Sequence, residues 1–235
     1  MTSPPFPAFR ADRKAALRPV SSTRRHVSST LIGLLLLGAN VAVVGRTNND
    51  CRIEPGAVCA EANLAGADLR GADLARINLL DADLGGAKLQ RVNLTEAILR
   101  GANLNRSVLT EASLEGADLT FATLVRANLH GANLANASLE DARLQDARLS
   151  GATFAGAKMR GAGLALSNLD NANLQRTDLT AAELNGASLR NADLRGAVLH
   201  NADLRGADLR GARYDASTDF SGANMRFCSG CPPAR

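Results

Sequence analysis

Residues 62–81 read ANLAGADLRGADLARINLLD, and the five-residue unit in that string, Ala-Asp/Asn-Leu-x-x, continues without a slip to Tyr214. With the central Leu taken as position i, a large apolar residue stands at every fifth position from Leu64 onward. Of these 31 centres, 28 are Leu, and the exceptions are Phe154, Met159 and Tyr214. Position i−2 is Ala in 26 of the 31 repeats. One repeated unit therefore decides the fold of most of the chain.

A period of five fits neither an α-helix, with its period of 3.6, nor a flat strand, with its period of 2. Positions i−2 and i of an extended segment point to the same side, so Ala and Leu face one interior. The chain must then turn a corner in each repeat, and Gly is frequent at i+2, where it eases such a turn. Repeated corners wind the chain into coils that stack as a solenoid.

These registered repeats resemble the pentapeptide-repeat proteins. The resemblance implies an all-β fold, a right-handed quadrilateral β-helix with four repeats per coil and about eight coils. We expect this β-solenoid over residues 62–226, preceded by a linker and N-terminal cap (46–61) and followed by a C-terminal tail (227–235). Upstream of residue 46 we expect a mostly disordered or helical leader.

Charge pairs test the number of sides within the sequence. At a separation of four repeats, opposite-sign pairs outnumber like-sign pairs nine to four. At a separation of three repeats, which would suit a three-sided coil, five opposite pairs stand against ten like pairs. Opposite charges on stacked strands are favourable, whereas like charges are not. The charges favour four sides.

The N-terminal residues have the composition of a targeting segment. Residues 1–30 are basic and contain a single acid, Asp12, and residues 31–45 are almost continuously apolar. About 15 apolar residues is short for a membrane span of ~20 and suits an export signal. Arg24 and Arg25 resemble a twin-arginine signal, although an accidental pair in a basic leader is an equal alternative. The expected location is the periplasm, the extracellular space or a thylakoid lumen. The alternative is a single uncleaved span through residues 31–45 that anchors the chain in a membrane.

The four cysteines, Cys51, Cys59, Cys228 and Cys231, lie outside the repeats. An even count in an exported chain suggests disulfides, most simply Cys51–Cys59 and Cys228–Cys231. Cys59 also falls on the five-residue register, so a small buried residue is the alternative there. A zinc site would need all four sulfurs together, yet the pairs stand at opposite ends of the solenoid.

The repeats offer no arrangement of residues that catalysis requires. His130 and His200 both stand at i+1 and are 14 repeats apart, which places them on opposite faces of a four-sided coil. The Asp and Asn residues at i−1 belong to the repeat, and we expect their side chains to hydrogen-bond turn backbone. We therefore predict no enzyme, no metal site and no cofactor.

One basic feature surrounds the last full coil. Basic residues occupy five consecutive i+1 positions: Arg190, Arg195, His200, Arg205 and Arg210. These residues would form a docking belt for an acidic partner or an anionic membrane. The favoured alternative is a solvated rim balanced by Asp193, Asp203 and Asp208.

The sequence favours an exported, non-catalytic structural or protein–protein interaction scaffold, and it does not name the protein partner or the oligomeric state. The resemblance supplies an alternative, a DNA mimic that inhibits or protects a DNA-binding enzyme such as gyrase. Such a mimic needs an extended negative face. The net charge of the chain is +4, but residues 61–226 carry 18 basic and 20 acidic residues, which interleave. Binding of nucleic acid is likewise not expected.

Overall fold

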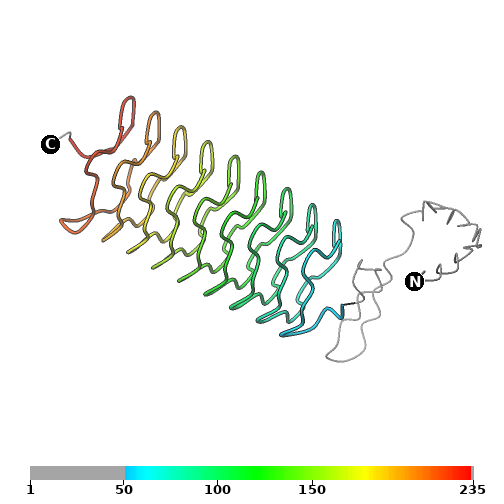
Figure 1. Cartoon of the computed structure of the whole chain (residues 1–235). Helices are drawn as coiled ribbons and strands as arrows, with labels where there is room; N and C mark the ends of the chain where they lie inside the picture. Colours follow the sequence, from blue (N-terminus) through cyan, green and yellow to red (C-terminus); the bar gives the residue numbers. More distant parts are fainter. Residues whose placement is uncertain (1–50, 234–235) are drawn as a thin grey trace, which may run out of the picture. The chain divides into compact units, whose positions relative to one another are not determined.

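The computed structural model describes residues 51–233, which form a stack of similar coils from the blue end to the red end of the coloured trace (Figure 1). Within these residues there is no helix, and no strand is longer than one bridging residue. Each bridge is parallel and joins position i−1 of one coil to position i−1 of the next. The all-β solenoid expected from the period of five is confirmed.

Four ladders of bridges define four faces. Face 1 begins at Val58, face 2 at Asn63, face 3 at Asp68 and face 4 at Asp73. Along each ladder the bridged residues are four repeats apart, as in Val58↔Asn78, so one coil contains four repeats. Faces 1, 2 and 3 have eight bridges each and face 4 has seven, in agreement with a quadrilateral β-helix of about eight coils.

Each repeat turns its corner by the same hydrogen bond. The Ala67 N–H donates to the Leu64 carbonyl at 3.0 Å, and Gly66 between them has φ of 67°. A positive φ at the third residue of the turn only is the mark of a type II turn. Non-glycine residues adopt this φ at many corners, for example Arg76 at 61°. The corner is therefore imposed by the stack rather than by glycine alone.

Backbone hydrogen bonds join the coils along each face. The Leu64 N–H donates to the Asp83 carbonyl of the next coil at 2.7 Å, and the Asp83 N–H donates back to the Ala62 carbonyl at 2.9 Å. This exchange repeats from coil to coil, so both the N–H and the C=O groups of the ladder residues find partners.

The interior is filled by positions i−2 and i. From Leu69 to Leu209, every centre is at most 1% exposed, including the larger Phe154 and Met159. Three polar residues replace Ala at i−2, and each is satisfied internally. Ser107 and Ser167 donate to the carbonyls of Leu104 and Leu164 in the preceding repeats at 2.7 Å, and Thr177 donates to the Phe154 carbonyl at 2.8 Å. The lumen is a packed core.

The N-terminal end is closed by residues ahead of the first expected repeat. The bridges begin at Val58, and Cys59 is fully buried in line with the Leu centres. Cys59 also forms a disulfide with Cys51, so both sequence-based alternatives for this residue hold at once. Ile53, 6% exposed, covers the interior.

The C-terminal end contains one inserted residue. After Tyr214 the spacing along the ladders changes from 20 to 21, as in Val198↔Asp219. The rings of Tyr214 and Phe220 meet edge to face with centroids 5.5 Å apart. Beyond them, Cys228 and Cys231 form the second expected disulfide. The last coil is therefore bulged, and both disulfide pairings expected from the sequence are present.

Candidate interaction surface

The acids at i−1 serve the turns, as expected. Asn63 Oδ1 accepts the Ala65 N–H at 3.2 Å, and Asp83 Oδ1 accepts the Gly85 N–H at 3.0 Å. The same bond from i−1 to the N–H at i+1 recurs at Asn103, Asn133 and Asp178, among others. These side chains are thus engaged in holding the fold and do not gather as paired acids.

Where Arg stands at i+1 and Asp at i−1 of the same repeat, the arginine folds back onto that Asp. Arg195 donates to both carboxylate oxygens of Asp193, at 2.9 and 2.6 Å. The Arg195 hydrogen bonds lower the pKa of Asp193 to about 2, with burial opposing them. Arg70, Arg205 and Arg210 make the same contact with Asp68, Asp203 and Asp208, and the pKa of each of these carboxyls is lowered. The signal for these pairs is the tripeptide Asp-Leu-Arg, which the sequence-based prediction did not use.

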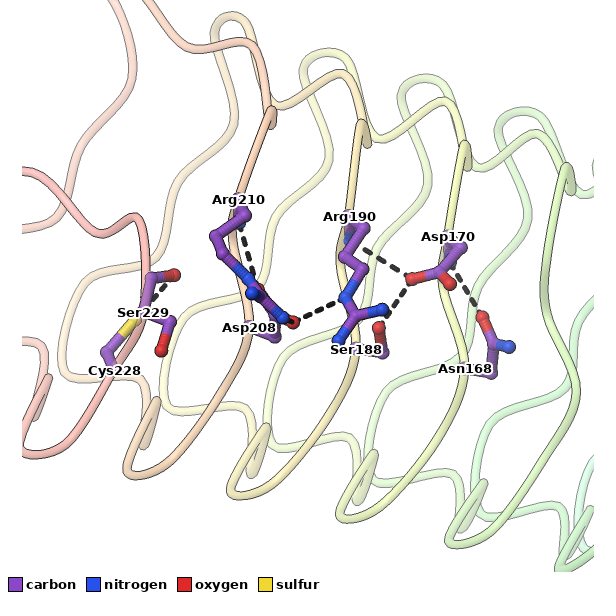
Figure 2. Close-up of polar contacts among 8 residues, drawn as sticks. All are labelled: Asn168, Asp170, Ser188, Arg190, Asp208, Arg210, Cys228 and Ser229. Carbon is purple, nitrogen blue, oxygen red and sulfur yellow. Dashed lines mark hydrogen bonds and ion pairs between the residues drawn. The ribbon is translucent and has the colours of Figure 1, made fainter.

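A further set of contacts joins position i+1 of one coil to position i−1 of the next. On face 3, Arg190 Nε bonds Asp208, which already holds Arg210, and the Ser188 hydroxyl donates to Asp170 at 2.5 Å (Figure 2). Figure 2 shows these side chains as one polar row across successive coils. Elsewhere, Gln175 donates to Asp193 by the same geometry at 2.9 Å. This register was also missed from the sequence.

Four of the nine charge pairs expected between neighbouring coils are ion pairs within 4.0 Å. They are Arg76–Glu96 at 2.8 Å, Arg126–Asp146 at 3.5 Å, Lys88–Asp68 at 4.0 Å and Arg91–Glu111 at 4.0 Å. In all four, the basic side chain is more than half exposed. Pairs of this kind each contribute roughly 0–1 kcal/mol.

The proposed docking belt is largely occupied by its own acids. Arg195, Arg205 and Arg210 pair with Asp193, Asp203 and Asp208, and Arg190 shares Asp208. His200 Nδ1 lies 2.7 Å from Ser221 Oγ, on face 1. These contacts favour the solvated rim. His130 lies on face 3, opposite His200, and its Nδ1 is 2.9 Å from Ser150 Oγ, so the two histidines form no common site.

Two further kinds of site, for a metal ion and for a membrane, concern residues 51–233. No three His, Cys, Asp or Glu side chains there are grouped so that they could hold a metal ion. None of that part of the chain is a helix long and apolar enough to cross a bilayer. The targeting segment and the alternative anchor, residues 1–30 and 31–45, lie outside the described residues.

Exposed apolar side chains gather on one face. Leu80 and Phe121 belong to face 1 or its corner, together with Val58 and Ile98, and all four are at least 36% exposed. Leu166, 65% exposed, stands on a different corner. The four-repeat register places the first four on one face of the solenoid.

One basic hollow of the described surface lies on face 2. It has a volume of about 620 Å³ and is lined by Gly85, Gly86, Asn105, Arg106, Val125, Arg126 and Arg143. We call these residues the arginine notch. A second hollow, of about 610 Å³, lies at the C-terminal end beside Tyr214, Phe220 and Met225. The second hollow is also lined by Ser221, the residue whose Oγ lies 2.7 Å from His200 Nδ1.

Comparison with known proteins identifies the class. The Pentapeptide repeats family model matches in eight copies, with matched segments 57–95, 87–124, 112–151, 122–161, 147–186 and 167–211. HetL, a pentapeptide repeat protein from the cyanobacterium Nostoc sp. strain PCC 7120, is similar at 34% identity. The match covers 73% of this chain and 86% of HetL, with a TM-score of 0.59. The chain belongs to the pentapeptide-repeat family, with its right-handed quadrilateral β-helix.

Two other similar structures share less with this chain. A pentapeptide repeat protein from the Arabidopsis thaliana thylakoid lumen is 25% identical, over 44% of this chain and 68% of that chain, with a TM-score of 0.34. The plasmid-mediated fluoroquinolone resistance protein QnrB1 is 21% identical, over 72% of this chain and 80% of that chain, with a TM-score of 0.27. These TM-scores are too low to carry a comparison of function. No curated protein sequence matches the chain.

Proposed function

We propose that this chain is an exported, non-catalytic scaffold that acts by contact with another protein. The observation that supports the proposal is that most positions of the repeat serve the fold itself. Positions i−2 and i fill the interior, and the acids at i−1 hold turns and arginines. What remains for function is the outer surface of four nearly flat faces, which suits recognition of a partner and not the enclosure of a substrate.

Export is supported by two features of the chain. The apolar residues 31–45 follow a basic leader, as in export signals. Both cysteine pairs are joined as disulfides, which persist in oxidising compartments outside the cytosol. HetL is described as involved in heterocyst differentiation regulation, and a regulatory role for this chain would act through contact with a partner.

Fractionation followed by affinity capture tests the proposal. The full chain with a C-terminal tag is produced in its native cell, and its cleavage and compartment are measured before cross-linked partners are captured. We expect a processed form outside the cytosol that captures a specific protein. A cytosolic form that protects gyrase would instead support the DNA mimic and contradict the scaffold. A double variant, Arg190→Gln with Arg205→Gln, tests whether the docking belt binds the partner. We expect capture to be unchanged, because those arginines already pair with Asp208 and Asp203.

A further inference from the structure

The arginine notch has two guanidinium groups that no acid of the described chain neutralises. Arg126 pairs with Asp146 at 3.5 Å. Arg106 and Arg143 make no ion pair with any residue between 51 and 233. By contrast, the corner residues Arg76 and Arg91 each face a glutamate one coil on. Other described arginines, such as Arg148 and Arg176, also lack an ion pair, but the notch brings two unpaired arginines to one hollow.

The stacking of the coils explains why the two charges are left over. Arg106 stands at a corner between Gly86 on one side and Arg126 on the other, each one coil away. Arg143 lies in the face 2 ladder between Thr123 and Gly163, neither of which is charged. Like charges on neighbouring coils are unfavourable, so Arg106 above all does not serve the stability of the fold.

The floor of the notch adds a hydrogen-bond donor and room. Asn105 Oδ1 accepts the Val125 N–H at 2.8 Å, which fixes the orientation of the amide. The Asn105 Nδ2 group is thereby left as a donor that lines the hollow, with no acceptor among residues 51–233. Gly85 and Gly86 carry no side chain, and a Cβ at Gly86 would meet nothing within 4 Å. The absent side chains leave the hollow open beside Arg106, on the side away from Arg143.

We propose that the arginine notch binds an acidic segment of a partner protein in an extended conformation. This proposal rests on the scaffold function and names its partner chemistry. Arg106 and Arg143 stand two coils apart, roughly 10 Å along the solenoid. Carboxylates two residues apart on an extended chain are separated by roughly 7 Å, so long Glu side chains at alternate residues reach both guanidinium groups. Arginine and carboxylate then pair through two parallel hydrogen bonds.

The surroundings of the notch favour this partner over other anions. Asp83 lies beside Gly85, and Asp146 lies beyond Arg126, so acids flank the notch on face 2. A nucleic-acid duplex carries a charge every ~1.7 Å and would run its phosphates over those acids. A bilayer surface is flat and would not reach the Asn105 donor on the floor of the hollow. A short acidic segment fits between Asp83 and Asp146.

Binding of a defined peptide tests the proposal. The probe is a capped octapeptide of alternating Glu and Ser with a neutral dye, titrated into the full chain by fluorescence anisotropy. The test variant is Arg106→Gln with Arg143→Gln, and the matched control is Arg76→Gln with Arg91→Gln, which removes the same two charges from exposed, ion-paired positions. We expect the dissociation constant to rise about ten-fold or more in the test variant and to stay within about two-fold in the control.

Cross-linking separates the notch from the basic leader. A photoreactive group at the centre of the peptide should mark residues close to Asn105 and Val125. Equal losses of binding in the two variants, or cross-links confined to residues 1–30, would overturn the proposal. So would a loss of duplex DNA or anionic-vesicle binding in the test variant without a loss of peptide binding.

The outcome stays distinct from that of the scaffold proposal. If the test variant still captures the cellular partner, the proposal for the arginine notch is wrong and the scaffold proposal is unaffected. If the unmodified chain binds the peptide at the notch but captures no protein, the scaffold fails instead.

Discussion

Replacement of Gly101 by Ala tests how the corners of neighbouring coils fit together. Gly101 has φ of 65°, and an added Cβ would overlap Asp81 Oδ1 of the preceding coil and lie 3.2 Å from its Cγ. Gly71 has the same corner position, φ of 66° and nothing within 4 Å of such a Cβ. The left-handed conformation costs a non-glycine residue about 1 kcal/mol, which is the full effect expected for Gly71→Ala. Gly101→Ala must also push the Asp81 side chain away from its present rotamer, at a further cost of about 0.5–1.5 kcal/mol.

Thermal and urea unfolding of the purified variants measure the difference. Since 1 kcal/mol lowers Tm by about 2–4 °C in a chain of this size, we expect Gly101→Ala to lower Tm about twice as far as Gly71→Ala. Adding Asp81→Ala to Gly101→Ala should recover the excess, because the exposed carboxylate that must move is then gone. Equal losses for Gly71→Ala and Gly101→Ala, or no recovery in the double variant, would refute the reasoning.

Three other changes have defined outcomes. Leu134→Ala, at a centre with 0% exposure, should lower the free energy of unfolding by about 2–5 kcal/mol, because a closed coil cannot collapse onto the cavity. A loss below about 1 kcal/mol, measured by urea titration, would contradict this packing. Asp193→Asn removes a carboxylate whose pKa is lowered to about 2 by Arg195, so the stability it contributes is present above about pH 4 and lost as the pH falls to about 2. The difference in unfolding midpoint between this variant and the unmodified chain should therefore shrink across that window, and a constant difference would refute the assignment. Arg106→Glu should raise stability by roughly 0.2–1 kcal/mol by placing opposite charge beside Arg126, while peptide binding falls; reduced stability would show that Arg106 serves the fold.

Much of the architecture follows from the repeat itself. The five-residue period requires a corner in every repeat, and the charge pairs four repeats apart select four sides. The step from Tyr214 to Phe220 is one residue too long, and the ladders register it as a spacing of 21. Both disulfides join the cysteines nearest in sequence. These features could be predicted because they depend on spacing along the chain alone.

The choice of partners on the surface could not be predicted from the same spacing. An Arg at i+1 can reach the Asp of its own repeat or an acid on the next coil, and Asp208 is held from both directions, by Arg210 and Arg190. Side-chain length and rotamer decide between these contacts. The arginine notch could not be predicted for a related reason. No motif marks it, because its character depends on the lack of acids beside Arg106 and Arg143 and on the lack of side chains at Gly85 and Gly86.

The four-repeat coil also limits how this protein can change its length during evolution. Loss or gain of four consecutive repeats removes or adds one whole coil and leaves every later side chain on its original face. Loss or gain of a single repeat turns everything downstream by a quarter of a revolution. One such event between Leu124 and Leu134 would carry Arg143 off face 2 and away from Arg106 while leaving the interior pattern intact. Selection that preserves the surface therefore accepts insertions and deletions of whole coils only. Selection that preserves the fold alone also accepts single repeats.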